Sequence, residues 1–227
     1  MMKKMILLVL MAAFAITSVE SYHVGDSGDG KVHFLNVLED VWLERGSRNY
    51  NYHNQLIIAR LRQFPLKRSL LRFESLPASC PTQKIRWAKM YVYYSYAHRA
   101  SWHTPQSSPA LTHTINIHRV LKPWKESQAT SIYRVRNVRW TSTYLNLGRD
   151  AERHPQYPPT TLYTWHPGSF IELDVTRAVV DWRMGAPNYG VLMKVVNEAQ
   201  NGRGLRFISN AHKDKKLHAR IQVMCDY

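Results

Sequence analysis

Short runs of alternating apolar and polar residues fill most of the chain, and one stretch, residues 170–194, departs from that pattern. Residues 170–175 alternate with the period of a half-buried strand. The spacing then changes to that of one helix face, carried by Val175, Ala178, Val179 and Trp182. Gly185 and Pro187 end the helix, and a second buried strand follows. The stretch therefore predicts a strand, a short helix near 175–184, a turn and a strand.

The rest of the pattern predicts strands separated by turn residues. The strongest run is residues 87–96, which is rich in aromatic and β-branched side chains. The other strand-like runs are 32–37, 41–43, 56–59, 69–73, 115–121, 131–138, 138–145, 205–208 and 217–224. Many short strands with a single helix predict an all-β fold, a jelly-roll β-sandwich.

The N-terminal residues follow a different pattern. Two lysines precede an apolar run, residues 5–16, and small residues follow it, which predicts a cleavable signal peptide over residues 1–21. The run is too short for a membrane span, which needs roughly 20 residues. We therefore expect a secreted protein without a membrane span, with a flexible lead-in at 22–31 and a single domain at 32–227.

Two cysteines, Cys80 and Cys225, are the only ones in the chain. In an oxidising compartment such a pair is most simply one disulfide, and two free buried thiols are the alternative. A disulfide closing so long a loop would stabilise the fold by on the order of 4 kcal/mol in the chain-entropy model.

The chain is strongly basic, with 31 Lys and Arg against 16 Asp and Glu and a net charge of +15. Such a field favours polyanionic partners: acidic polysaccharide, an anionic mineral or matrix surface, or anionic lipid. Because we expect secretion, nucleic acid is the least favoured of the polyanionic partners. The alternative is a generally cationic, solubilising surface without a specific site.

Clusters of cations are the best candidate binding residues. In residues 132–136 apolar and basic residues alternate, so we expect Arg134 and Arg136 to share a solvent face while Tyr133 and Val135 point inward. Arg139 follows beside Trp140. A second cluster precedes the last strand (Lys213, Lys215 and Lys216), and a third comprises Arg60, Arg62, Lys67, Arg68 and Arg72. Arginine can bind carboxylates or sulfates through two hydrogen bonds.

Tryptophans divide into core and surface candidates. We expect Trp87, Trp140 and Trp182 in the core, because they fall on apolar faces. Trp102 and Trp165 lie in loops, where an exposed ring would stack on a sugar. No catalytic or metal-binding motif occurs, so we predict a protein that is not an enzyme and needs no cofactor or metal.

Several motifs, taken in their order along the chain, resemble the DNRLRE domain. They are S-L-L-R-F-E-S-L-P (69–77), W-A-K-M-Y-V-Y (87–93), I-N-I-H-R-V-L-K-P-W-K-E (115–126) and the stretch 170–194, within a resemblance that spans 32–227. The resemblance implies a secreted jelly-roll module that binds or supports rather than catalyses. Some members of that family bind acidic polysaccharides such as alginate. In contrast to the family's usual architecture, we expect a stand-alone domain without an attached lyase, hydrolase or adhesion module.

Three functions follow as hypotheses. The first is a non-catalytic extracellular matrix protein that binds acidic polysaccharide through cationic patches. The second is a structural protein of a silica or carbonate biomineral matrix, using the same cations. The third, a polysaccharide lyase, has no catalytic motif to support it.

Overall fold

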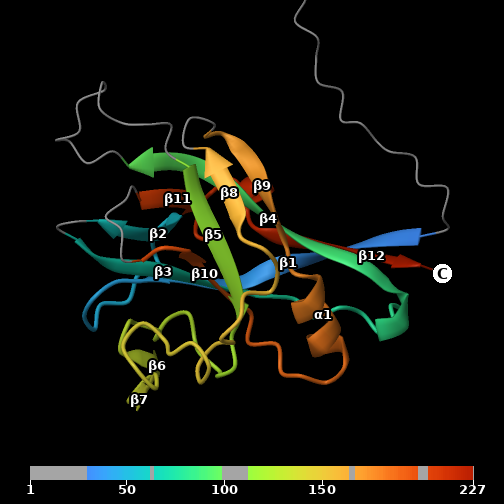
Figure 1. The fold of residues 1–227 in the computed structure, drawn as a ribbon, viewed down its shortest axis with the longest axis horizontal. Coiled ribbons are helices and arrows are strands. Elements are labelled where there is room, and N and C mark those ends of the chain that lie inside the picture. Colours follow the sequence, from blue (N-terminus) through green and yellow to red (C-terminus); the bar gives the residue numbers. More distant parts are fainter. Residues whose placement is uncertain (1–29, 62–63, 99–111, 164–166, 199–203, 227) are drawn as a thin grey trace, which may run out of the picture.

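The computed structural model describes residues 30–61, 64–98, 112–163, 167–198 and 204–226 (Figure 1). The predicted signal peptide, Trp102 and Trp165 lie outside these residues. The elements are β1 (Gly30–Leu43), β2 (Gln55–Leu61), β3 (Phe64–Phe73), the 3-10 turn η1 (Thr82–Lys84), β4 (Ile85–His98), β5 (Thr112–Arg119), β6 (Tyr133–Val135), β7 (Val138–Arg139), β8 (Thr160–Tyr163), β9 (Ser169–Asp174), α1 (Thr176–Arg183), β10 (Val191–Val195), β11 (Gly204–Ile208), the 3-10 turn η2 (Lys215–Leu217) and β12 (Arg220–Asp226).

Ten strands form one continuous sheet that folds over into two layers, as in a sandwich (Figure 1). Layer 1 contains β9, β4, β12 and the first half of β1, with β11 and β2 continuing beside the far half of β4. Layer 2 has the order β1, β3, β10, β5, β8. All these pairings are antiparallel. The predicted all-β fold is therefore confirmed.

Strand β1 belongs to both layers because its register shifts between Val37 and Glu39. Its first half pairs with β12 and its second half with β3. An irregularity of this kind bends a strand and lets it change partners. The hairpin of β2 and β3 makes a second connection between the layers.

The main core fills the space between the layers. In β4 the buried residues alternate, so that Ala88, Met90 and Val92 point inward, each with 0% of its surface exposed. Inward residues from both layers join the same cluster: Leu35, Leu71, Phe73, Ile117, Leu173, Val191, Met193 and Ile221. The core therefore takes alternate residues of the strands in both layers.

Helix α1 closes one end of the main core, and its position confirms the short predicted helix. Val179 is buried, and Trp182 packs against the cluster while remaining half-exposed. Gly185 ends the helix with a φ of 104°. Gly190, in the turn to β10, approaches β3 so closely that a Cβ atom there would lie 2.0 Å from the carbonyl oxygen of Leu71.

The predicted disulfide joins Cys80 to Cys225, with 5.9 Å between the two Cα atoms. It ties the last strand to the loop before η1. None of the helices in the described part of the chain has the length and apolar character that a membrane crossing requires.

Two expectations about the core and the strands are wrong. Trp87 does not enter the core: it shares the outward parity of Lys89, whose Nζ lies 5.5 Å from the indole centroid. Residues 131–145 do not form two long strands, and only the short ribbon of β6 and β7 appears. The cause is local, because the Thr130 hydroxyl accepts from the Ile132 and Tyr133 amides and Asn137 turns the chain with a φ of 62°.

Candidate functional site

Residues 121–159, which we term the cover, lie across the outer side of layer 2. They bring a second apolar cluster onto that side, in which Trp124, Trp140 and Leu145 meet Leu70 and Leu192 from the strands beneath. Both indole nitrogens of the cover are bonded: that of Trp124 donates to the Tyr189 carbonyl at 2.8 Å and that of Trp140 to the Thr130 carbonyl at 3.0 Å. The cover is thus a packed layer.

A buried carboxylate and a buried guanidinium fix the far part of the cover. The Asp150 carboxylate accepts hydrogen bonds from Thr141 and Asn146. Arg68 of β3 donates to the carbonyls of Tyr144 and Leu145 and pairs through two bonds of 2.7 Å with Glu198. Tyr144 and Leu145 have positive φ values of 68° and 69°, so Arg68 holds a backbone conformation that costs energy on its own.

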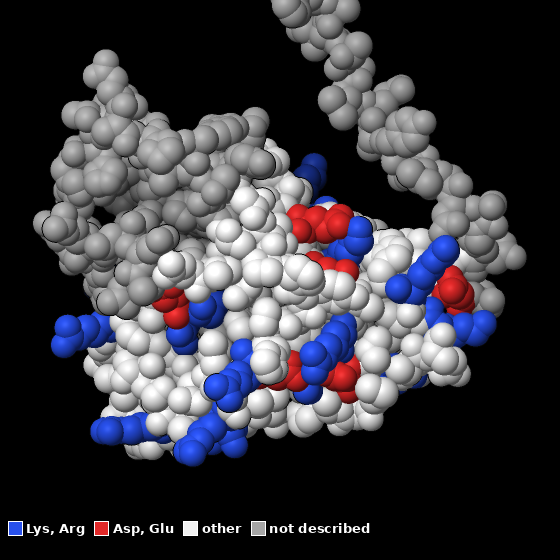
Figure 2. All heavy atoms as spheres, in the orientation of Figure 1, with Lys and Arg blue, Asp and Glu red and all other residues white. Residues whose placement is uncertain are grey.

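The cover separates its charges, with cations outward and carboxylates inward. It contains seven Lys and Arg residues: Lys122, Lys125, Arg134, Arg136, Arg139, Arg149 and Arg153. All are exposed except the half-buried Arg134, and none pairs with a carboxylate of the described residues. Figure 2 shows basic side chains standing out where the β6–β7 ribbon lies, without acidic ones among them.

The three carboxylates of the cover are all engaged beneath it. Asp150 is 1% exposed, and Glu152 pairs with Arg119 of β5 at 2.8 Å. Glu126 accepts from the Asp40 amide of β1, and burial raises the pKa of its carboxyl. The outer surface of the cover therefore presents positive charge with little compensation.

A shallow groove of about 510 Å³ opens between the cover and the loop that follows β1. Its walls are Ser47, Asn49, Ser127, Gln128, Thr130, Tyr133, Arg136 and Asn137. The lining thus combines hydroxyls, amides, one aromatic ring and one guanidinium, and it contains no carboxylate. Groups of this kind bind the hydroxyls, ring faces and anionic substituents of sugars.

Hydrogen bonds hold the two walls of the groove together. The Asn49 amide group donates to the carbonyls of Glu126 and Ala129, both at 2.7 Å. The Ser131 hydroxyl donates to the Gly46 carbonyl at 3.0 Å and accepts from its amide at 3.1 Å. The groove is therefore largely preformed, which lowers the entropic cost of binding.

The first predicted cation cluster gathers at this groove, although not on one strand face. Arg136 lies in the β6–β7 turn, where its backbone amide donates a hydrogen bond to Oε1 of Gln128 at 2.8 Å. Arg139 lies over the Tyr133 ring, 5.7 Å from its centroid, and Arg134 donates to the Pro123 carbonyl at 2.9 Å. Tyr133 lines the groove, so its predicted inward orientation is wrong.

The other predicted clusters lie elsewhere. Lys213, Lys215 and Lys216 are exposed on the loop before β12. Lys67, Arg68 and Arg72 of the third cluster each pair with a carboxylate, at 3.1, 2.7 and 2.9 Å, so they serve the fold. The side chains of Arg60 and Arg62, like Trp102, lie outside the described residues.

Sequence reasoning missed the neutral half of the groove. The Gly- and Asn-containing segment 46–52 identifies a turn, but its contact with residues 126–131 is long-range. No periodic pattern in the sequence predicts a contact between these two segments. The available signal was the unusual density of Ser, Asn and Gln in both segments.

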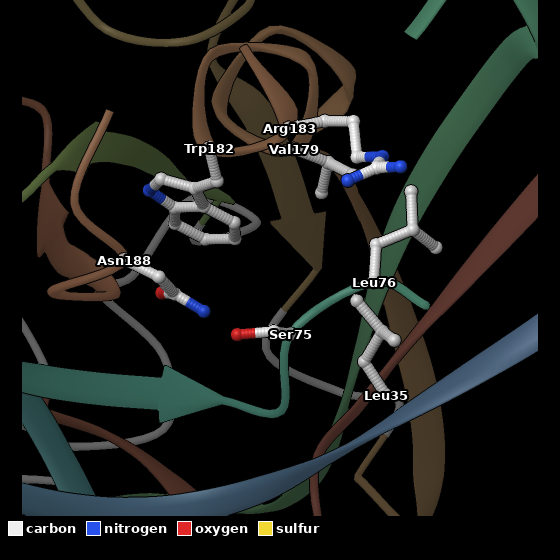
Figure 3. Close-up of a pocket in the computed structure, with 7 residues that line it drawn as sticks. All are labelled: Leu35, Ser75, Leu76, Val179, Trp182, Arg183 and Asn188. Atoms are coloured by element: carbon white, nitrogen blue, oxygen red, sulfur yellow. The ribbon is translucent and has the colours of Figure 1, made fainter. Parts of the chain in front are cut away.

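A second cavity, of about 130 Å³, lies between α1 and the loop after β3 (Figure 3). Four apolar residues and three polar ones line it: Leu35, Leu76, Val179, Trp182, Ser75, Arg183 and Asn188. Arg183 donates to the carbonyls of Cys80 and Ala78, and Asn188 to that of Phe73. Two of the three polar residues thus already hold loops in place, and we assign this cavity no ligand.

Comparison with models of known protein families found no match, and a search of curated protein sequences found none either. Within the described residues, no group of three or more His, Cys, Asp and Glu side chains is arranged to hold a metal ion.

Proposed function

We propose that the chain is a secreted, non-catalytic binding protein of the extracellular matrix, which engages acidic polysaccharide at the groove and basic surface of the cover. The observation that carries this proposal is the segregation of charge in the cover. Its cations are exposed, with Arg136 in the wall of a carboxylate-free groove and Arg139 over the Tyr133 ring beside it, while its carboxylates are used beneath the surface. The predicted signal peptide and the Cys80–Cys225 disulfide support secretion.

The lining of the groove favours a sugar chain over a mineral surface. A mineral face requires repeated charge on a flat surface, whereas this groove is concave and contributes hydroxyl, amide and ring groups between the cations. The biomineral-matrix function therefore remains the second hypothesis. The DNRLRE resemblance and a jelly-roll strand arrangement are part of the same proposal.

The test measures binding of heparin and polygalacturonate at 0.15 M salt to a cover variant, Lys125→Gln/Arg136→Gln/Arg139→Gln. Each exposed ion contact contributes about 0.5 kcal/mol, so the loss of three should lower the affinity roughly tenfold. The matched control is Lys213→Gln/Lys215→Gln/Lys216→Gln, which removes the same charge from the loop before β12. Equal losses in both variants would mean that only the net charge matters, and would refute a site on the cover.

A further inference from the structure

The outer side of layer 1 carries an ordered array of aromatic and cationic side chains, which we term the aromatic face. Because Ala88, Met90 and Val92 point into the core, the alternate residues of β4 point outward. The same parity holds on the neighbouring strands. The face consists of Trp87, Lys89, Tyr91 and Tyr93 on β4, Arg220, Gln222 and Met224 on β12, Val32, Phe34 and Asn36 on β1, and Phe170, Glu172 and Asp174 on β9, where Asp174 accepts the backbone amide hydrogen of Thr176.

The strand register aligns these residues in rows across the sheet. One row runs through Phe34, Gln222, Lys89 and Asp174. The next runs through Asn36, Arg220, Tyr91 and Glu172. Neighbouring strands lie roughly 4.8 Å apart, and successive outward residues on one strand lie about 6.8 Å apart. The face is therefore a regular platform several side chains wide.

Arg220 lies at the centre of this platform. Its guanidinium carbon is 4.4 Å from the centroid of the Phe170 ring and 5.9 Å from that of Tyr91. Phe170 in turn meets Tyr93 edge-on at 5.2 Å. No carboxylate of the described residues pairs with Arg220. Stacking fixes the plane of the guanidinium and leaves its N–H edges for an external acceptor.

The neighbouring charges on the face neutralise one another. Lys89 pairs with Glu172 at 2.5 Å, and the Tyr91 hydroxyl donates to the same carboxylate at 2.9 Å. Arg220 is thus the cation of this group that lacks a partner, and aromatic rings surround it. A uronate or a sulfated sugar carries groups that bind both: an anionic group for the guanidinium and apolar ring faces for the aromatic side chains.

Nothing in the described chain covers this side. Both hydrophobic clusters lie elsewhere, one between the layers and one under the cover. Phe34 keeps 57% of its surface exposed, and the other side chains of the face are half-exposed or exposed.

We propose that the aromatic face is a second binding surface for acidic polysaccharide, so that one molecule joins two polysaccharide chains. The cover lies on the outer side of layer 2 and the aromatic face on the outer side of layer 1, which are opposite sides of the sandwich. A single short sugar chain cannot contact both. The bridging part of this proposal rests on the proposed function of the cover, whereas binding at the aromatic face does not.

Calorimetry with a heparin hexasaccharide and with hexagalacturonate tests the number of sites. We expect two oligosaccharides per chain for the wild type, one for Arg220→Gln and one for the cover variant. Arg220→Lys keeps the charge but not the planar two-bond geometry, so its affinity at the second site should fall at least threefold. Arg177→Gln, an exposed arginine of α1, is the matched control and should keep both sites.

Light scattering with long heparin chains tests bridging. The wild type should form particles that grow with added heparin, and either variant should bind heparin without forming them. One site per wild-type chain that Arg220→Gln leaves intact, or an Arg220→Gln variant with two sites, would refute the aromatic face. If Arg220→Gln abolishes binding and the cover variant loses none, the proposed function of the cover fails while this surface stands. Arg220-dependent binding of cellohexaose but of neither acidic probe would refute the acidic class of ligand.

Discussion

The side chain of Asp40, on β1, is buried where this strand contacts the loop after β11. Asp40 is 1% exposed, and its Oδ2 accepts a hydrogen bond from the Asn210 backbone amide at 2.7 Å. Its Oδ1 has no hydrogen-bond partner among the described residues. Burial raises its pKa to about 7, an effect that the Asn210 amide only partly opposes. The charged form of Asp40 is therefore unfavourable in the folded state.

This group should make the protein less stable as pH rises from about 4 to about 7. The folded state then binds more protons than the unfolded chain, whose aspartates titrate near 3.9, so stability falls by up to about 1.4 kcal/mol per pH unit. Asp40→Asn keeps the contact with Asn210 and removes the titration. Urea unfolding from pH 4 to 8 should show the variant gaining stability over the wild type up to pH 7 and no further. A difference that does not change with pH would contradict the burial argument.

His118 contributes the opposite slope in an overlapping range. It is 2% exposed on β5, beneath the cover, and burial lowers its pKa to about 4. The unfolded chain binds a proton near 6.5 that the folded state refuses, so stability is lost as pH falls from about 6.5 to about 4. The Asp40→Asn comparison isolates one group because His118 titrates in both proteins.

At the scale of elements, the cover depends on its two buried tryptophans. Trp140 is 4% exposed, and its indole fixes the Thr130 carbonyl in the wall of the groove. Trp140→Ala should lower the free energy of unfolding by roughly 3–5 kcal/mol, the usual cost of such a truncation. It should also weaken heparin binding measured under folding conditions, because the groove loses its support.

Trp182→Ala is the control for that prediction. Trp182 packs against the main core at the end closed by α1 and lines the cavity of Figure 3, apart from the groove. It should reduce stability and leave heparin affinity unchanged in the folded protein. Equal effects on binding would mean that the groove follows global stability and not the packing of the cover.

The elements also show what a sequence pattern can predict. Alternation predicted β9 and helical spacing predicted α1, because burial on one side imposes a period, whereas β4 was predicted from its aromatic and β-branched residues. Trp87 was expected in the core because it belongs to an apolar run, but Ala88 and Met90 take the buried side of β4, so Trp87 points outward with Lys89. Here parity is the stronger signal.

The cover and the groove were beyond such a pattern. Arg134, Arg136 and Arg139 lie on or beside one short ribbon and not on one strand face, and their setting depends on contacts far along the chain, such as those from the Asn49 amide group. The aromatic face was missed for a related reason. Its side chains come from four strands, and only the register places Arg220 opposite Tyr91.

At the scale of the whole molecule, the disulfide joins two segments that are far apart in the sequence. Cys80 and Cys225 are separated by 145 residues, and Cys225 lies in β12, between β1 and β4. Arg183 of α1 donates to the Cys80 carbonyl at 2.9 Å, so the helix is linked to the same corner. The cover and its groove lie on the other layer, and Arg119 of β5 links them to α1 because it pairs with Glu152 of the cover at 2.8 Å and lies 3.4 Å from Asp181.

Replacing both cysteines by alanine should therefore separate stability from binding. Closing a loop of this length removes unfolded-state entropy equivalent to roughly 4–5 kcal/mol in the chain-entropy model, so the midpoint of urea unfolding should fall accordingly. Below that midpoint, heparin affinity should equal that of the wild type, because the cations and walls of the groove are held by the second apolar cluster. Reduction of the wild type should reproduce the shift of the variant, which tests that the lost bond and not the substitution is responsible. Unchanged stability would show that the unfolded chain gains little freedom when the bond is absent, and lost affinity would show that the two layers are coupled through this corner.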